Sequence, residues 1–438
     1  MRIIKRKIFL VLGAGLIMIV AGCGGGKDEK YRFFPHLDAP KPPQIGDGEA
    51  IAFIGEDFMV KPGFSSHLPL IVLGNAELTV IDGETGDNNL SNAPLFHSQI
   101  RIRPGRMNAD EKGSFAFTLV DGFGTEKEAA LLGMAGGADW ALNASLRDKS
   151  LMRDYLAYSL ASKLMPETPG ARFCEVFFSA GEGLKYQGVY LLTEEPGAAE
   201  GISPTEDDKL RRIIYSEDPK VFSKYPEVIN VDSFVDYFII NEFLQNYDAG
   251  LDSAYVRYGD RVILGPVRNN DRILGNTFPL PFDPEIITMQ RTPFFERLTR
   301  DAVFLDRIEG RFSELRRNVL GDDTVIRLID ETAFFLGPAR LRDWKRWSSE
   351  YTGIISLVPE TADPEGVTTT EQTLTFEQEL IKIKYLVIRH GRIMGNSIHR
   401  MTWQEDLFDS SYNTRRSTIL IVAYCFLFIL SVRIGRRG

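Results

Sequence analysis

The hydrophobic and polar positions divide the chain into a part with strand-type patterning and a later part with helical patterning. From Ala50 to Leu119, short apolar runs alternate with turn signals such as IDGETGDNN, which predicts a mostly antiparallel β lobe. Residues 149–164 carry apolar side chains at helical spacing and predict an amphipathic helix. Two further strands, RFCEVFF and YQGVYLLTEE, complete the predicted β-rich part. From Val231 onward the pattern is mainly helical, with one hairpin.

The N-terminus has the pattern of an export signal. Four basic residues precede an apolar run from Ile8 to Val20, and the run ends in Val-Ala-Gly-Cys. This ending resembles a bacterial lipobox, with Val20 where Leu is usual, and implies cleavage before Cys23 and lipidation of its thiol. An uncleaved short anchor is the alternative. We therefore expect a lipoprotein signal over 1–23 and, because residues 24–48 are rich in Gly, Pro and Lys, a flexible tether after it.

A second apolar run, residues 417–432, lies near the C-terminus. It is at the short end for a spanning helix, but arginines flank it on both sides without an acid. This predicts a transmembrane helix, with the tail RIGRRG on the cytoplasmic side and an exported body, in agreement with the positive-inside rule. A sorting tail that is cut and replaced is an alternative that the sequence leaves open. The expected location is the bacterial cell envelope.

Charge and cysteine content narrow the function of the body. The two ends hold nine of the 51 basic residues and none of the 60 acidic ones, so the body between them has a net charge of −18. Such an acidic body argues against nucleic acid or anionic lipid as its main partner. Besides Cys23 and Cys425, only Cys174 is present, so the body forms no internal disulfide. We expect Cys174 to be a small buried hydrophobe.

The most informative segment runs from Asn241 to Asn276. An apolar helical run, FVDYFIINEFLQ, gives way to a loop that carries Asp248 and, five residues later, Ser253. A predicted hairpin follows, and then Asp271. Phosphoryl-transfer kinases use this order: a loop Asp orients the substrate hydroxyl, a polar residue helps to hold a metal, and an acid after a hairpin holds magnesium. Carboxylates at ordinary surface turns would give the same spacing.

The sequence motifs around these acids resemble those of the CotH (spore-coat protein H) kinase family. The family pattern N-x-D, a hairpin and G-P-x-W-D-x-D-x-x-x-G-N is matched by Asn246, Tyr247, Asp248, Gly265, Pro266, Asp271, Gly275 and Asn276. The chain departs from it at Arg268, where the family has Trp, and at Asn269, where it has Asp. Upstream, SHLPLIVL, QIRIRPGRMNADEKGSFAFTL, WALNASLRDKSLMRDYLAYSLASKL and YQGVYLLTEE resemble further family blocks in the family's order. The resemblance covers about Leu68 to Asn276.

This resemblance implies an α+β, atypical protein-kinase-like fold of two lobes. The expected β-rich N-lobe covers 49–200 and the mainly helical C-lobe 201–410. The implied activity is transfer of phosphate from ATP to Ser or Thr of an envelope or surface protein, with Mg²⁺ or Mn²⁺. The implied roles are catalytic base for Asp248, main metal ligand for Asp271, and weaker metal ligands for Asn269 and Ser253.

Nucleotide contacts are expected from the β-rich part. The resemblance matches Lys112 to a lysine that contacts nucleotide phosphates, and a solvated strand-edge lysine is its alternative. Arg101 and Arg103 alternate onto one face of QIRIRPG, so two guanidiniums could converge on one phosphate, or else form a rim of surface charge. Glu194 falls where the family has a glutamate that pairs with a phosphate-binding lysine or borders the nucleotide; Glu195 beside it leaves that assignment open.

Two other classes of function remain open. Asn269 cannot neutralise a metal ion as a carboxylate does, which favours a pseudokinase that serves as a surface binding or scaffold lipoprotein. A structural lipoprotein without a nucleotide site is the third reading. No HExxH metalloprotease motif, GxSxG elbow or Walker lysine motif is present, so the sequence gives little support to those classes of enzyme.

Overall fold

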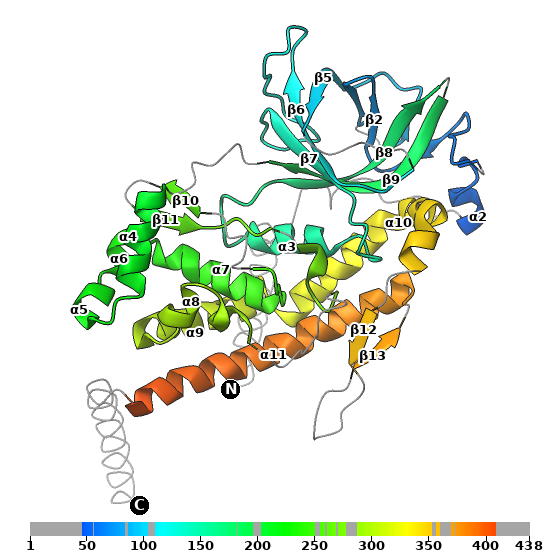
Figure 1. Cartoon of the computed structure of the whole chain (residues 1–438). Helices are drawn as coiled ribbons and strands as arrows, with labels where there is room; N and C mark the ends of the chain where they lie inside the picture. The colour runs from blue at the N-terminus through cyan, green and yellow to red at the C-terminus, as the bar shows by residue number, and fades with distance from the viewer. Residues whose placement is uncertain are drawn as a thin grey trace, which may run out of the picture. The chain divides into compact units, whose positions relative to one another are not determined.

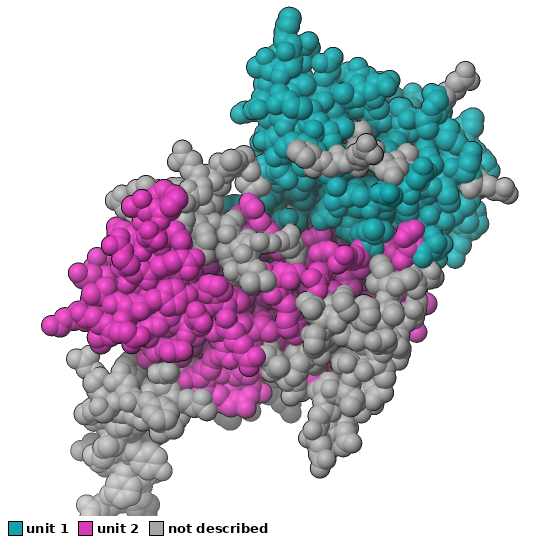
Figure 2. Space-filling view, viewed as in Figure 1, with its two compact units in different colours: residues 1–146, 158–195, 323–349 teal, residues 147–157, 196–322, 350–438 magenta. Residues whose placement is uncertain are grey.

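The computed structural model describes residues 46–55, 57–83, 86–103, 110–181, 183–195, 203–249, 255–258, 261–268, 270–276, 287–352, 356–359, 369–372 and 374–408 (Figure 1). The predicted signal with Cys23, the tether up to residue 45, Ser253, Asn269 and the predicted span 417–432 lie outside these ranges. The chain forms two compact units, coloured separately in Figure 2. The first comprises 1–146, 158–195 and 323–349; the second comprises 147–157, 196–322 and 350–438.

The first unit is built on a closed barrel with the strand order β2-β3-β5-β6-β7-β9-β8. Its strands are β2 (Leu70–Gly74), β3 (Glu77–Ile81), β5 (Phe96–Ile102), β6 (Phe115–Val120), β7 (Asp139–Asn143), β8 (Ala171–Ala180) and β9 (Gly183–Glu194). Neighbours pair antiparallel except β2 and β8, whose parallel pairing closes the barrel. The unit also contains helix α2 (Asp47–Ala50) and a short pair, β1 (Ser65–Ser66) with β4 (Asn88–Asn89).

Alternating side chains of the barrel strands form one apolar core. Every barrel strand contributes to the cluster, which includes the fully buried Phe117, Trp140 and Val176. Because side chains of a strand alternate between its two faces, the period-two pattern in the sequence places these residues on a common side. Cys174 belongs to the same cluster, as expected, and burial raises the pKa of its thiol far above the ordinary range. A thiol held neutral in this way is a packing residue.

Helix α10 (Asp322–Thr352) supplies ion pairs to the barrel unit. The helix is kinked at Gly337, whose φ is 41° and ψ −129°, and Pro338 follows. Beyond the kink, Arg342 makes two hydrogen bonds of 2.8 and 2.6 Å with the carboxylate of Glu175 on β8. Glu175 is fully buried and also accepts from the hydroxyl of Tyr186. A buried carboxylate needs such partners because its isolated charge would be costly away from water.

The second unit is mainly helical. Its helices are α4 (Pro204–Ile214), α5 (Pro219–Phe222), α6 (Tyr225–Val228), α7 (Val231–Phe243), α8 (Phe295–Leu298), α9 (Ala302–Arg316) and α11 (Phe376–Phe408), with 3-10 helices η3 (Asn270–Arg272) and η4 (Met289–Arg291). Two hairpins are present, β10 (Tyr255–Tyr258) with β11 (Arg261–Leu264), and β12 (Ser356–Pro359) with β13 (Thr369–Gln372). Helix α7 packs against α9 and α11. It is buried on nearly all sides, which explains its continuous apolar run.

Several expectations from the patterning are confirmed. The antiparallel strands, the two strands β8 and β9, and the hairpin β10–β11 all form. The helix predicted over 149–164 is α3 (Arg153–Ala161), which begins later because residues 148–152 form a turn held by the Asp148 side chain. Closure of the strands into a barrel was not predicted. Within the described residues, no helix combines the length and apolar character needed to span a bilayer.

Candidate active site

The loop that carries Asp248 is organised by the side chain of Asn246. Helix α7 ends at Phe243, and Gln245, with a φ of 53°, turns the chain away from the helix axis. The buried Asn246 amide donates to the side-chain oxygen of Asn241 at 3.0 Å and to the carbonyl of Arg268 at 3.3 Å. Its own oxygen accepts from the backbone N–H of Asp248 at 3.1 Å. One side chain therefore joins the end of α7, the Asp248 loop and the chain that leaves the hairpin.

Asp248 lies in the turn after α7, with its side chain 26 % exposed. Its carboxylate is 3.5 Å from the guanidinium of Arg272, the residue that follows Asp271. The hairpin thus folds back so that the two acidic loops, separated by more than twenty residues of sequence, come next to each other. The roles predicted for Asp248 and Asp271 stay predictions.

The segment from Asn270 to Asn276 is fixed along its whole length by hydrogen bonds. Its first N–H donates to the carboxylate of Asp154 at 3.2 Å. The amide of Asn276 donates back to the carbonyl of Asp271 at 2.6 Å and to the carbonyl of Arg147 at 2.9 Å. Two residues in the bend, Leu274 and Gly275, have φ values of 50° and 73°. Asn276, the last residue of the family motif, thus closes the loop that begins at Asp271.

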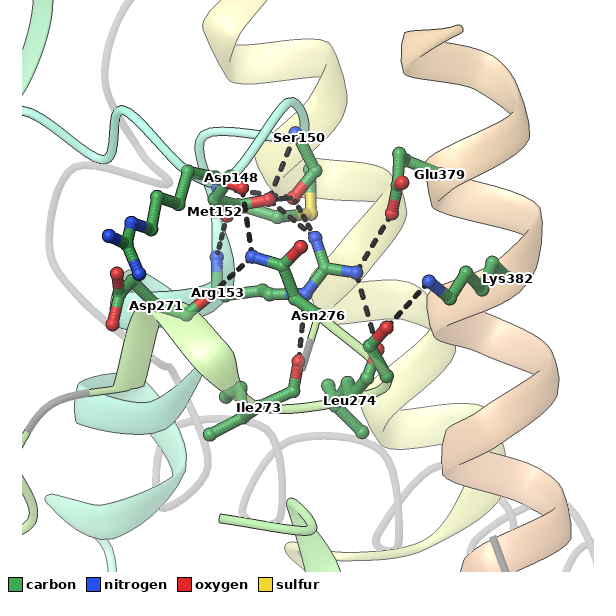
Figure 3. Close-up of polar contacts among 12 residues, drawn as sticks. Asp148, Ser150, Met152, Arg153, Asp271, Ile273, Leu274, Asn276, Glu379 and Lys382 are labelled. Atoms are coloured by element: carbon green, nitrogen blue, oxygen red, sulfur yellow. Dashed lines mark hydrogen bonds and ion pairs between the residues drawn. The ribbon is translucent and has the colours of Figure 1, made fainter. Parts of the chain in front are cut away.

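A fully buried arginine, Arg153 at the start of α3, holds this segment from the other side (Figure 3). Its guanidinium donates to the carbonyls of Ile273 at 2.9 Å and Leu274 at 3.2 Å. It forms ion pairs with Asp148 and with Glu379 of α11. Because both carboxylates are buried as well, the arginine balances two charges while it satisfies two carbonyls. Asp148 also accepts from the backbone N–H groups of Ser150 and Arg153, so it holds the turn that precedes the helix.

The Asp271 side chain lies outside this network. Figure 3 shows its carboxylate pointing away from Arg153. Within the described part of the chain it makes no ion pair and no hydrogen bond to another residue. Burial raises the pKa of the Asp271 carboxyl above its ordinary value, and the negative charge of Asp148 adds to the rise, against the opposing charges of Arg147 and Arg272. A partly buried carboxylate in this state favours a cation beside it.

The acids and polar groups of this region fit a divalent metal only in part. Hard cations take oxygen ligands, and the Asp271 carboxylate is available and held on a fixed backbone. Its neighbour Asp148 is already engaged by Arg153 and Ser150, so it does not supply the second carboxylate. No group of three or more His, Cys, Asp or Glu suited to a metal occurs among the described residues. Asp271 can supply one metal ligand. The other two predicted ligands, Ser253 and Asn269, lie outside the described residues.

The two arginines predicted to converge on one phosphate have different partners. Arg101 on β5 donates to the carbonyl of Gly124 at 2.9 Å and lies 3.8 Å from Glu126. Arg103, just after β5, is 3.5 Å from Asp139 and forms a close ion pair with Glu195. Both side chains are more than one third exposed, so these are surface pairs of small energetic weight. The described geometry keeps the two guanidiniums on separate acids.

Lys112 lies in the interior of the barrel unit. Its ammonium donates to the carboxylate of Asp343 on α10 at 2.7 Å, and both side chains have no exposed surface. The same carboxylate oxygen accepts from the backbone N–H of Val189 at 2.8 Å. The backbone at Gly188 lies so close to the Asp343 carboxylate that a Cβ there would be 2.3 Å from that oxygen, so glycine is needed at this position. In this arrangement Lys112 joins β9 and α10 through a buried charge pair.

Glu194, at the end of β9, ties together two backbone turns. Its carboxylate accepts from the N–H of Gly170 at 2.8 Å and from the N–H of Gly136 at 3.2 Å. The neighbouring Glu195 is the one that pairs with an arginine, Arg103. The structure thus separates the two glutamates that the sequence left ambiguous, one toward the backbone and one toward a cation.

Several residues of this region escaped the sequence reasoning. The word DKSLMR contains both Asp148 and Arg153, and an arginine in the first turn of a predicted amphipathic helix is an available signal, since that position disfavours a cation. Glu379 and Lys382 on α11 have no local signal, because their partners are more than 100 residues away. Glu242 on α7 is similar: it is buried, accepts from the N–H of Met289 at 2.7 Å and contacts His390 at 3.1 Å.

A known protein family matches a large part of this chain. The family model described as CotH kinase protein matches residues 100–215 and 203–384, which together span well over half of the chain. No curated protein matches the chain. The matched region includes Lys112, the Arg153 cluster and both acidic loops, and the resemblance noted in the sequence is thereby confirmed. The chain belongs to the CotH kinase family.

Proposed function

We propose that this protein is a CotH-like phosphotransferase that transfers the terminal phosphate of ATP to a Ser or Thr of an envelope or surface protein. The observation that carries the proposal is the joining of the two acidic loops: Asn246 ties the Asp248 loop to the chain leaving the hairpin, and Arg272 bridges to Asp248. An atypical protein-kinase-like fold needs these acids near one another. In it, the barrel unit would correspond to the N-lobe and the helical unit to the C-lobe.

The residues would divide the work as follows. Asp271 would hold a Mg²⁺ or Mn²⁺ ion, and the ion when bound would neutralise charge on the phosphates of ATP. Asp248 would orient the acceptor hydroxyl and take its proton. Because the Asp248–Arg272 contact is long and partly exposed, its hold on the carboxylate is weak, and an acceptor hydroxyl can compete for it. The predicted ligands Asn269 and Ser253 would complete the metal site.

A second candidate function is a pseudokinase that binds or scaffolds at the cell surface. The observation that favours it is Lys112: the lysine matched to phosphate binding is sealed in a buried pair with Asp343. A nucleotide phosphate would have to replace Asp343 as its partner. Asn269, in place of the family's acid, points the same way.

Calorimetric titration of the full chain in detergent with ATP, with and without Mg²⁺ or Mn²⁺, tests both candidates. We expect metal-dependent binding, and phosphate transfer to an acceptor protein separates the kinase from the pseudokinase. Asn269→Asp restores the family's second carboxylate and should tighten metal-dependent binding by about tenfold, the order of effect of one well-placed charged ligand group. If neither Asn269→Asp nor Asp271→Ala changed metal affinity, the loop would not be a metal site and the kinase proposal would fail.

We further propose that the body is exported and held in the bacterial envelope by a lipid on Cys23 and by the apolar run 417–432, where it meets its protein substrate. The support is the signal-type N-terminus and the arginine flanks of the C-terminal run. Truncation before residue 416 combined with Cys23→Ser should release the protein from the membrane fraction, whereas either change alone should leave it bound. Mass spectrometry of the native N-terminus should find a lipidated Cys23; an intact Met1 would contradict this proposal.

A further inference from the structure

Three consecutive backbone carbonyls after Asp271 are each held by a buried cation. Arg153 binds the carbonyls of Ile273 and Leu274, and Lys382 of α11 donates to the carbonyl of Gly275 at 2.7 Å (Figure 3). Lys382 is 5 % exposed, and Arg153 has no exposed surface. The carbonyls at the end of the segment are thus bound by two cations, and the charge of Arg153 is balanced by Asp148 and Glu379.

The bend explains why cations are used. Leu274 and Gly275 have positive φ values, so the chain bends here, and the carbonyls of the bend take their hydrogen bonds from Arg153 and Lys382. Buried carbonyls must find donors, and hydrogen bonds from charged donors are roughly twice as strong as neutral ones. Glu379 completes the arrangement, because its carboxylate binds Arg153 at 2.8 Å and lies one helical turn before Lys382 on α11. Helix α11, far along the chain, therefore helps to fix the backbone of the loop after Asp271.

We infer that Arg153 and Lys382 are positioning residues for the metal ligand Asp271: they fix the backbone from Ile273 to Gly275 and thereby set how tightly the site holds its divalent cation. The inference rests on the proposed function. Neither residue touches the reacting groups, and both act through the backbone. Outer partners that orient a metal ligand commonly change metal affinity by 10- to 100-fold when they are removed, and this is the range expected here.

The decisive variant is Lys382→Met, which keeps an unbranched apolar side chain of similar size and removes the charge and the donors. In calorimetric titrations of the full chain in detergent, we expect metal-dependent ATP affinity to fall about 10- to 100-fold. Lys384→Met is the matched control, because it removes a lysine from the same helix at a partly exposed position. It should leave the affinity within about twofold. Arg153→Lys is a second variant that keeps the charge but loses the fork that spans two carbonyls, and its affinity should also fall.

A pH profile separates positioning from a general loss of structure. Burial lowers the pKa of Lys382 to about 8, with Glu379 and Asp148 opposing that shift and Arg153 and Lys149 favouring it. Lys382 is therefore charged below about pH 8 and loses its charge above it. The wild-type affinity in the presence of Mg²⁺ should weaken between pH 7 and pH 9 by a component that Lys382→Met lacks. A purely structural lysine would leave the two profiles parallel.

Hydrogen exchange gives a measurement independent of nucleotide. In Lys382→Met the amides of residues 270–276 should exchange faster, while those of the barrel strands keep their wild-type rates. If the wild type shows no metal-dependent binding of ATP, the proposed function fails and this inference fails with it. If the wild type binds and Lys382→Met binds equally well, or exchange in 270–276 is unchanged, the positioning role alone is overturned.

Discussion

Asp271→Ala should abolish metal-dependent ATP binding, whereas Asp248→Ala should leave binding intact and remove phosphate transfer. Asp271 offers a partly buried carboxylate that has no side-chain partner among the described residues and sits on a fixed loop. Its loss would remove the main anionic ligand of the metal, and we expect at least a ~100-fold fall in affinity. Asp248 would act on the acceptor hydroxyl, and losing a general base costs roughly 10²- to 10⁴-fold in rate. The measurements are calorimetric ATP affinity with Mn²⁺ and the initial rate of phosphate transfer.

Glu227→Ala is the matched control for this pair, because it removes an exposed carboxylate from the same unit. Both its affinity and its rate should match the wild type. Equal losses of ATP binding in Asp248→Ala and Asp271→Ala would show that the two acids do not divide the work as proposed. Binding that persists in Asp271→Ala would remove this residue from the metal site.

The sequence was sufficient for the local elements. Strand alternation, the apolar run of α7 and the turn between β10 and β11 are short-range signals, and they predicted elements that the structure contains. The side chains of Asn246 and Asn276, which belong to the family motifs, both hold backbone groups of the acidic loops. Most of their contacts are local, such as Asn246 with Asp248 and Asn276 with Asp271, although Asn276 also donates to the carbonyl of Arg147, 129 residues away. The site roles of the two acids stay predictions.

Long-range partners were not predictable in the same way. Lys112 and Asp343 are 231 residues apart, and nothing in either local pattern distinguishes a buried pair from two surface charges. Arg153 and Glu379 are 226 residues apart and present the same difficulty. The barrel closes through the parallel pairing of β2 with β8, which depends on sheet geometry rather than on any local pattern. The interpretation of Lys112 as a strand-edge residue failed for this reason: its Asp343 partner, supplied by a distant helix, covers it.

The buried environment of Lys112 allows a structural role to be distinguished from a nucleotide-binding role. Lys112→Met would leave the Asp343 carboxylate buried without the ammonium that pairs with it, while the N–H of Val189 still donates to it. Breaking a buried ion pair from one side typically costs about 3–5 kcal/mol in the free energy of unfolding. The double variant Lys112→Met with Asp343→Asn should recover much of the loss, because the uncompensated charge is gone. Chemical unfolding of the full chain in detergent gives the comparison.

Lys185 provides the matched control for this last prediction. It pairs with Asp110 at 2.6 Å, but the acid is 77 % exposed, so Lys185→Met should change the free energy of unfolding far less than Lys112→Met. If Lys112 instead serves the nucleotide, Lys112→Met would weaken ATP binding at nearly unchanged stability. A large loss of stability with rescue in the double variant would assign Lys112 to the joining of β9 and α10, and would leave phosphate binding to other groups.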